Sequence, residues 1–151
     1  VADVAKAVRD ELHIEFFGNS SQMDRVLAEA DYVSLHMPLT SKTRHIIGGR
    51  AFELMKPTAS LINVARGELV DEDALLKALQ ASSIKGAGLD VFAREPLDPV
   101  HPLLKMENVV VTPHVAGVTT GTSRRRGQAL ADNLERFAQD LPLLYRVTSA
   151  E

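Results

Sequence analysis

Short apolar runs alternate along this chain with longer segments in which apolar residues recur every three or four positions. The short runs lie at residues 32–35, 60–64, 86–91 and 109–113, and each has the length of a buried strand. Within them apolar residues are continuous instead of alternating with polar ones, which is typical of a parallel sheet covered on both faces. This order predicts an α/β fold with a doubly wound, mainly parallel sheet.

The longer segments carry the signals of amphipathic helices. Helices are predicted for residues 1–12, 21–30, 49–56 and 72–80, and a last helix carries the apolar stripe of Leu130, Leu134, Phe137 and Leu141. Ser21 and Asp24 are spaced as in a capping box, and Asp71 can cap the helix that follows it. Residues 92–108 carry three prolines, which predicts a long ordered loop or short helical turns.

Composition and charge narrow the class of protein. The chain has 151 residues, enough for one domain with a hydrophobic core, and no cysteine, which excludes disulfides and a cysteine nucleophile. The net charge of −3 argues against nucleic acid or an anionic membrane as a partner, and the arginines of residues 123–127 are interpreted as a solvated helix face. Without a membrane-length apolar stretch or a secretory signal, we expect a cytoplasmic enzyme or binding domain.

A charged or imidazole side chain lies in the segment that follows each predicted strand. In chain order these segments contain His36, Met37 and Pro38; Ala65, Arg66 and Gly67; Asp90 and Glu95; and Pro113, His114 and Gly117. The carboxyl ends of parallel strands share one edge of a sheet, where ligands bind in open α/β folds. A single arginine or histidine at such a position is more often structural, so it is their convergence that predicts a catalytic site.

The predicted set suits one kind of chemistry. Glu95 and His114 can form a carboxylate–imidazole pair that moves a proton at a substrate oxygen. Arg66 offers a planar fork for a carboxylate, and Gly67 leaves room for backbone to approach a ligand. A 2-oxo or 2-hydroxy acid would satisfy Arg66 and His114 together, and hydride transfer is its natural reaction.

Four segments of the chain resemble the signature blocks of one family. They read ADYVSLHMPLTSKTRHIIG, LMKPTASLINVARGELVDEDALLKAL, GAGLDVFAREPL and NVVVTPHVAG, and the resemblance is densest from Ala30 to Gly117. In this order and spacing they are similar to the D-isomer-specific 2-hydroxyacid dehydrogenases, which include phosphoglycerate, glyoxylate/hydroxypyruvate and D-lactate dehydrogenases. The resemblance implies a Rossmann-like domain that binds NAD or NADP, in a protein that is a homodimer.

The resemblance also implies a role for each site residue. Arg66 would hold the substrate carboxylate, His114 would be the acid/base with Glu95 as its partner, and Asp90 would face the nicotinamide. No metal is implied. The residues implied to line the cofactor cleft are Met37, Pro38, Val64, Ala65, Arg66, Asp90, His114, Val115, Ala116 and Gly117.

One part of the family pattern is missing from the sequence. The Gly-x-Gly-x-x-Gly turn that binds pyrophosphate does not follow any strand, because Gly86 and Gly88 stand at the start of the predicted strand at residues 86–91 instead of after one, and Val91 stands where the third glycine is required. We therefore expect an incomplete doubly wound sheet that lacks its first βαβ unit. In this interpretation residues 1–120 are the carboxyl-terminal part of the cofactor domain, and residues 121–151 are directed toward a substrate domain.

Two other functions remain open on the sequence. The same fold serves in transcriptional corepressors that sense dinucleotide without catalysis, which the intact set of Arg66, Glu95 and His114 disfavours. A metal hydrolase could use His36, Asp90, Glu95 and His114 as ligands. Arg66 in the same crevice would repel the cation, so we prefer the dehydrogenase.

Overall fold

The computed structural model of the chain describes residues 11–12 and 14–146, and the predicted helix at residues 1–12 falls mainly outside them. The chain divides into two compact units, the first ending at Pro113 and the second beginning at His114. Each unit is described by itself below. No helix among the described residues has the length and apolar character needed to cross a membrane.

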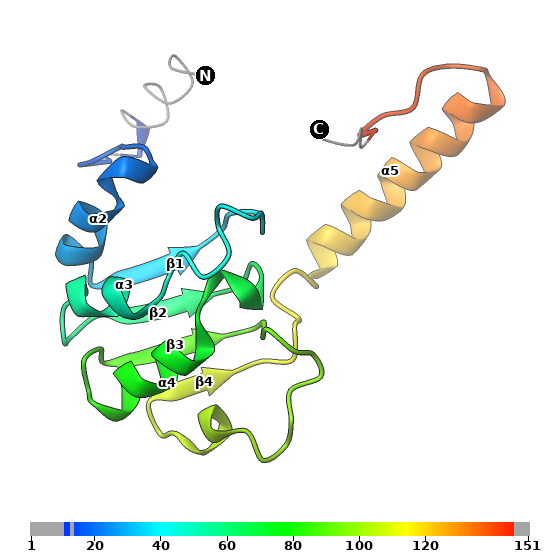
Figure 1. The fold of residues 1–151 in the computed structure, drawn as a ribbon. Helices are drawn as coiled ribbons and strands as arrows, with labels where there is room; N and C mark the ends of the chain where they lie inside the picture. The colour runs from blue at the N-terminus through cyan, green and yellow to red at the C-terminus, as the bar shows by residue number, and fades with distance from the viewer. Residues whose placement is uncertain (1–10, 13, 147–151) are drawn as a thin grey trace. The chain divides into compact units, whose positions relative to one another are not determined.

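The first unit is built on a four-stranded parallel sheet, as predicted. Its strands are β1 (Tyr32–Leu35), β2 (Ser60–Asn63), β3 (Gly86–Leu89) and β4 (Val109–Val111), and they lie side by side in chain order (Figure 1). The last residues of the strands are register partners, Leu35 with Asn63, Asn63 with Leu89, and Leu89 with Val111. The four carboxyl ends therefore form one straight edge.

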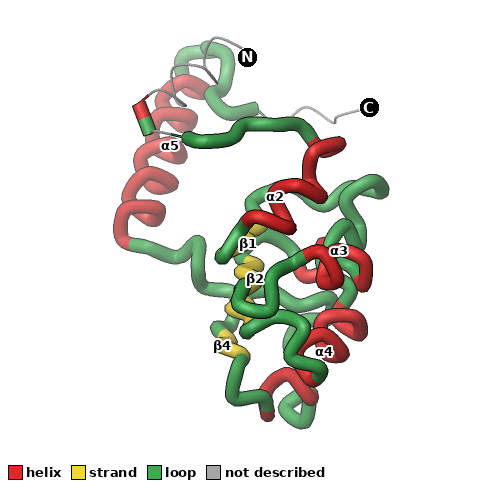
Figure 2. Tube along the Cα trace, turned by 90° about the vertical axis from the view of Figure 1, so that its left-hand side faces the viewer, coloured by secondary structure: helices red, strands yellow, loops and turns green. Residues whose placement is uncertain are grey.

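Three α-helices lie among the described residues of the first unit. They are α2 (Met23–Glu29), α3 (Gly49–Leu54) and α4 (Glu72–Gln80), and 3-10 turns lie at η1 (Ser20–Gln22), η2 (Gly67–Leu69) and η3 (Pro102–Lys105). Both α3 and α4 lie on the same face of the sheet (Figures 1 and 2). Consecutive parallel strands joined by right-handed crossovers require this, because every crossover then passes over the same face.

The opposite face of the sheet is exposed within the first unit. Burial alternates along β1 and β2, with Val33 and Leu61 buried, whereas Tyr32 is 72% exposed and Val110 on β4 is 70% exposed. The prediction that helices cover both faces is thus wrong for the described residues of this unit taken alone. The alternation escaped the sequence pattern because Tyr32 and Val110 are apolar despite being exposed.

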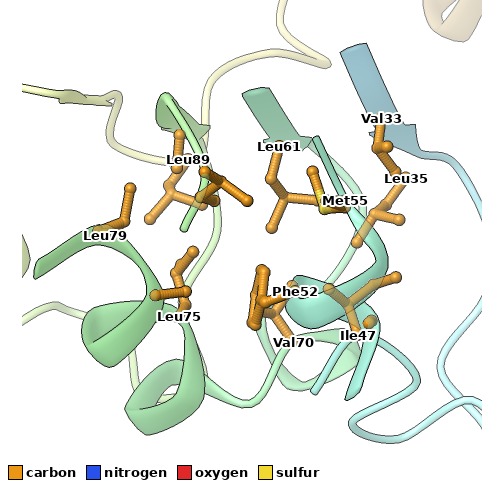
Figure 3. Packing of buried hydrophobic residues seen from close by; sticks show 14 of the residues in the cluster. Val33, Leu35, Ile47, Phe52, Met55, Leu61, Val70, Leu75, Leu79 and Leu89 are labelled. Atoms are coloured by element: carbon orange, nitrogen blue, oxygen red, sulfur yellow. The ribbon is translucent and has the colours of Figure 1, made fainter. Parts of the chain in front are cut away.

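The hydrophobic core lies between the sheet and its helices. Leu61 and Leu89 point from the strands toward Phe52 of α3 and Leu75 of α4 (Figure 3). All four side chains are at most 7% exposed and belong to one cluster of buried residues. Burial of this apolar surface is the main favourable term holding the helices on the sheet.

Helix capping follows the sequence in one case and not in another. Asp71 caps α4 as predicted, since its side chain accepts a hydrogen bond of 3.0 Å from the Ala74 amide. The predicted box of Ser21 and Asp24 is wrong, because Asn19 and Gln22 form it two residues earlier, at the start of η1. Asn19 is the better acceptor at that point because its side chain reaches the Ser21 amide at 2.9 Å.

The second unit consists mainly of α5 (Thr120–Ala138), capped by the Thr119 side chain. The predicted stripe lies on it, with Leu130, Leu134 and Phe137 between 62% and 74% exposed, whereas Leu141 lies beyond the helix.

Candidate active site

The predicted site segments leave the sheet from its straight carboxyl edge. Met37 and Pro38 follow β1, Val64 to Gly67 follow β2, and Asp90 follows β3. Since the strands are parallel and in register, these three segments start side by side. The structure thus brings the predicted residues of the first unit to one edge, as the pattern required.

Asn63 shapes the segment that carries Arg66. Its side chain is 1% exposed, and it donates a 2.9 Å hydrogen bond to the Arg66 carbonyl oxygen and accepts one of 3.1 Å from the Ala65 amide. Both bonds lie inside the turn, so one buried amide sets the backbone path from β2 to the guanidinium. Sequence reasoning missed Asn63, although a polar residue at the end of an apolar run was the signal available.

The Arg66 side chain is exposed at this edge. Its Nη1 atom donates a 2.7 Å hydrogen bond to the carbonyl oxygen of Ala65, which folds the guanidinium back over its own turn. Val64 and Ala65 beside it are half-buried. A planar cation presented on a fixed turn, next to the apolar side chains of Val64 and Ala65, is suited to binding a carboxylate.

Asp90 is the other buried polar side chain among the described residues, at 3% exposed. Thr112, which follows β4, donates a 2.5 Å hydrogen bond to its Oδ1 atom, and the Asp90 amide donates to the Asn63 carbonyl at 3.0 Å. Asn63 and Asp90 therefore lie next to each other, at the end of β2 and directly after β3. Burying polar groups costs free energy unless they are hydrogen-bonded, and both side chains have hydrogen-bond partners here.

Glu95 lies in the loop that follows Asp90. Its side chain is exposed and its Oε1 atom accepts a 3.0 Å hydrogen bond from the Phe92 amide, which holds the carboxylate over its own loop. The peptide bond between Glu95 and Pro96 is cis.

Gly67 brings the Arg66 turn into contact with this loop. A β-carbon at Gly67 would lie 1.9 Å from the Phe92 carbonyl carbon and 2.3 Å from the Ala93 nitrogen. The side of Gly67 where a β-carbon would lie is thus filled by the chain's own backbone. The expected approach of a ligand to the Gly67 backbone remains a prediction.

His114 is the first residue of the second unit and has an unusual backbone. Its φ of 54° lies in the left-handed region of backbone conformations, which residues other than glycine seldom adopt. Val115, Ala116 and Gly117 follow it, and the Val118 amide bonds to the Val115 carbonyl at 2.8 Å. Backbone strain of this kind gathers at functional positions. The closeness of His114 to Arg66 remains a prediction.

The proposed ligands of a metal hydrolase find no support here. Within residues 11–12 and 14–146, no group of three or more histidine, aspartate or glutamate side chains is arranged to hold a metal ion. His36 instead makes a 2.8 Å hydrogen bond through Nε2 with Ser34 of β1.

Replacing Asn63 with leucine is expected to lower the free energy of unfolding by about 2–4 kcal/mol, since two turn hydrogen bonds disappear and the Ala65 amide loses its acceptor. Chemical denaturation of the 151-residue chain measures this. Asn133→Leu in the second unit is the matched control for removing an amide, because Asn133 also makes two hydrogen bonds, both with Leu144. The Asn133 side chain is only half-buried, whereas that of Asn63 is buried. A loss below about 1 kcal/mol for Asn63→Leu would contradict this account of the turn.

A parallel sheet that gathers charged groups at its carboxyl edge is the architecture of Rossmann-like nucleotide-binding domains. The family described as "D-isomer specific 2-hydroxyacid dehydrogenase, NAD binding domain" matches residues 3–116. The chain belongs to this family, and the matched residues correspond to its NAD-binding domain. The resemblance drawn from the signature blocks is therefore confirmed.

Comparison with individual proteins gives the same family. The glyoxylate reductase of Korarchaeum cryptofilum (strain OPF8) is 47% identical over 127 residues, which are 84% of this chain and 37% of the relative. A D-isomer specific 2-hydroxyacid dehydrogenase from Xanthobacter autotrophicus Py2, solved with NADPH and MES, is 36% identical with a TM-score of 0.76 and is matched over 87% of this chain and 54% of its own.

A second solved structure is that of the Lactobacillus delbrueckii ssp. bulgaricus enzyme in its NAD complexed form. It is 40% identical, with a TM-score of 0.74, over 83% of this chain and 42% of its own. The chain thus spans less than half the length of the curated relatives it matches.

Proposed function

We propose that this chain is the catalytic part of the cofactor domain of an NAD(P)-dependent reductase that converts a 2-oxo acid into a 2-hydroxy acid. The observation that carries the proposal is the register of the sheet, because it starts the Arg66 turn and the Asp90 loop side by side at the carboxyl edge. The glyoxylate reductase name of a relative at 47% identity favours a small 2-oxo acid such as glyoxylate or hydroxypyruvate.

In the proposed reaction Arg66 binds the carboxylate of the substrate and polarises its carbonyl group. His114, in its protonated form, gives a proton to the carbonyl oxygen, and Glu95 orients the ring and stabilises its charge. When bound, NADH or NADPH supplies the hydride that reduces the carbonyl carbon. The products are a 2-hydroxy acid and oxidised cofactor, so protons and electrons balance.

The residues at the edge fit the nicotinamide half of such a cofactor. Val64 and Ala65 are half-buried beside the buried Asp90, which gives an apolar surface with one polar group. Met37, Pro38 and the segment from His114 to Gly117 are proposed to line the rest of the cofactor site. Relatives solved with NADPH and with NAD support either nicotinamide cofactor for this site.

The whole protein is proposed to be a cytoplasmic homodimer with one further domain for the substrate. Residues 1–120 would serve the cofactor, and residues 121–151 would be directed toward the substrate domain. The exposed stripe of Leu130, Leu134 and Phe137 supports this, since apolar side chains in a row favour a protein contact. The complete enzyme below means a protein that joins this chain to that domain and to a glycine-rich phosphate-binding turn.

The 151-residue chain alone is expected to bind NADH weakly, because its sequence contains no turn that offers backbone amides to the pyrophosphate. Titration with NADH, followed by cofactor fluorescence, measures this affinity. The complete enzyme is the positive control. Micromolar binding by the chain alone would contradict the proposed dependence on the missing turn.

The activity itself is tested by oxidation of NADH and NADPH at 340 nm in the complete enzyme. Glyoxylate and hydroxypyruvate are expected to be reduced, and the corresponding aldehydes or ketones without a carboxylate are expected to be poor substrates, since they give Arg66 nothing to bind. Equal rates with and without the carboxylate would reject the role proposed for Arg66.

A further inference from the structure

Glu72 reaches from the first turn of α4 to the loop that carries Glu95. Its Oε1 atom accepts a 2.7 Å hydrogen bond from the Ala93 amide, and the two residues are 21 positions apart in the sequence. The side chain is half-buried, although the loop it binds is exposed. A carboxylate bound to a backbone amide at this distance makes a strong, charge-assisted hydrogen bond.

The two successive amides of this loop are thus held by two different carboxylates. The Phe92 amide bonds to Glu95 in the same loop, and the Ala93 amide bonds to Glu72 of α4. Only the second bond ties the loop to another element. The backbone it holds, Phe92 and Ala93, is also the backbone that fits against Gly67.

Glu72 and Gly67 therefore both contact the backbone of Phe92 and Ala93. Gly67 follows Arg66 directly and allows the closest approach of the two loops, whereas Glu72 prevents them from separating. The Arg66 turn needs no help from Glu72, because Asn63 holds it from within. Loss of Glu72 would leave the Arg66 turn in place and would remove the hydrogen bond that joins Ala93, two residues before Glu95, to α4.

We propose that Glu72 is a positioning residue for the reaction, acting through the Ala93 amide to set Glu95 relative to Arg66. This inference rests on the proposed function, since it gives Glu95 and Arg66 their roles. Its consequence is that a side chain outside the carboxyl edge controls turnover without touching substrate or cofactor. Substrate affinity, which depends on Arg66, is left nearly unchanged.

Two variants and a control test this in the complete enzyme. Glu72→Ala removes the acceptor, and Glu72→Gln keeps an acceptor oxygen at the same reach. Asp73→Ala removes the neighbouring, exposed acid from the same helical turn. Hydrogen exchange of the peptide containing Ala93 is measured together with kcat and KM. The kcat value is calculated per cofactor-binding site.

Glu72→Ala is expected to speed exchange at Ala93 by about tenfold and to lower kcat by ten- to about a hundredfold, with KM within about twofold of the parent. Glu72→Gln and Asp73→Ala are expected to stay within about threefold of the parent in both measurements. Faster exchange with unchanged kcat would overturn the inference, as would a Glu72→Gln variant as poor as Glu72→Ala. Failure of the proposed function is distinct, because the unmodified complete enzyme would then reduce no 2-oxo acid.

Discussion

Replacing His114 with alanine in the complete enzyme is expected to lower kcat for a 2-oxo acid by about a thousandfold or more. The proposed reaction develops negative charge on the carbonyl oxygen, and without the imidazole no group of this chain is assigned to protonate it. Affinity for NADH is expected to change by no more than about threefold, because the variant removes a proton donor and not the cofactor surface. Steady-state kinetics at 340 nm and a cofactor titration measure the two effects.

A matched histidine elsewhere in the chain controls for the loss of an imidazole. His101 accepts a hydrogen bond from the Leu103 amide at the start of η3, and asparagine can replace it as a cap. His101→Asn is expected to keep kcat within about twofold of the parent. If His114→Ala also kept its turnover within tenfold, the acid/base assignment would be rejected. A dinucleotide sensor without catalysis would become the better interpretation only if the parent protein itself reduced no 2-oxo acid.

The sheet and its edge could be predicted from the sequence because they depend on local patterns. Each strand is a short apolar run, and parallel pairing follows once helices alternate with strands. The predicted run at residues 60–64 ends one residue beyond the observed strand, Ser60–Asn63, and the site residues follow it as expected. Asp71 was likewise found from its position before an amphipathic segment.

The contacts that hold the loops together could not be predicted in this way. Glu72 is an ordinary acidic residue in a helical first turn until its bond to Ala93 is seen, and Gly67 is one glycine among nine in the sequence. Both contact residues more than twenty positions away in the sequence, and the periodicity of apolar residues does not predict contacts between such distant residues. The exposed face of the sheet was missed for a related reason. The residue type of an apolar strand position does not tell whether its side chain is buried or exposed.

Gly67 offers the sharpest stability test of this loop contact. Replacing it with alanine is expected to lower the free energy of unfolding by about 3 kcal/mol or more, or to prevent folding. The added carbon would meet the Phe92 carbonyl carbon at 1.9 Å and its oxygen at 2.2 Å, and both are backbone atoms that no rotamer change can move. No glycine among the described residues has a positive φ, so at Gly67 the clash is the cause and not the backbone conformation.

Gly49 is the matched control, because an added carbon there meets nothing within 4 Å and the residue is the first of α3. Gly49→Ala is expected to leave stability unchanged or to raise it by up to about 1 kcal/mol, since alanine loses less conformational entropy on folding. Chemical denaturation followed by circular dichroism compares the two variants in the same chain. A Gly67→Ala protein as stable as the control would mean that the Arg66 turn and the Glu95 loop do not touch, and Glu72 would then have no fixed surface against which to hold that loop.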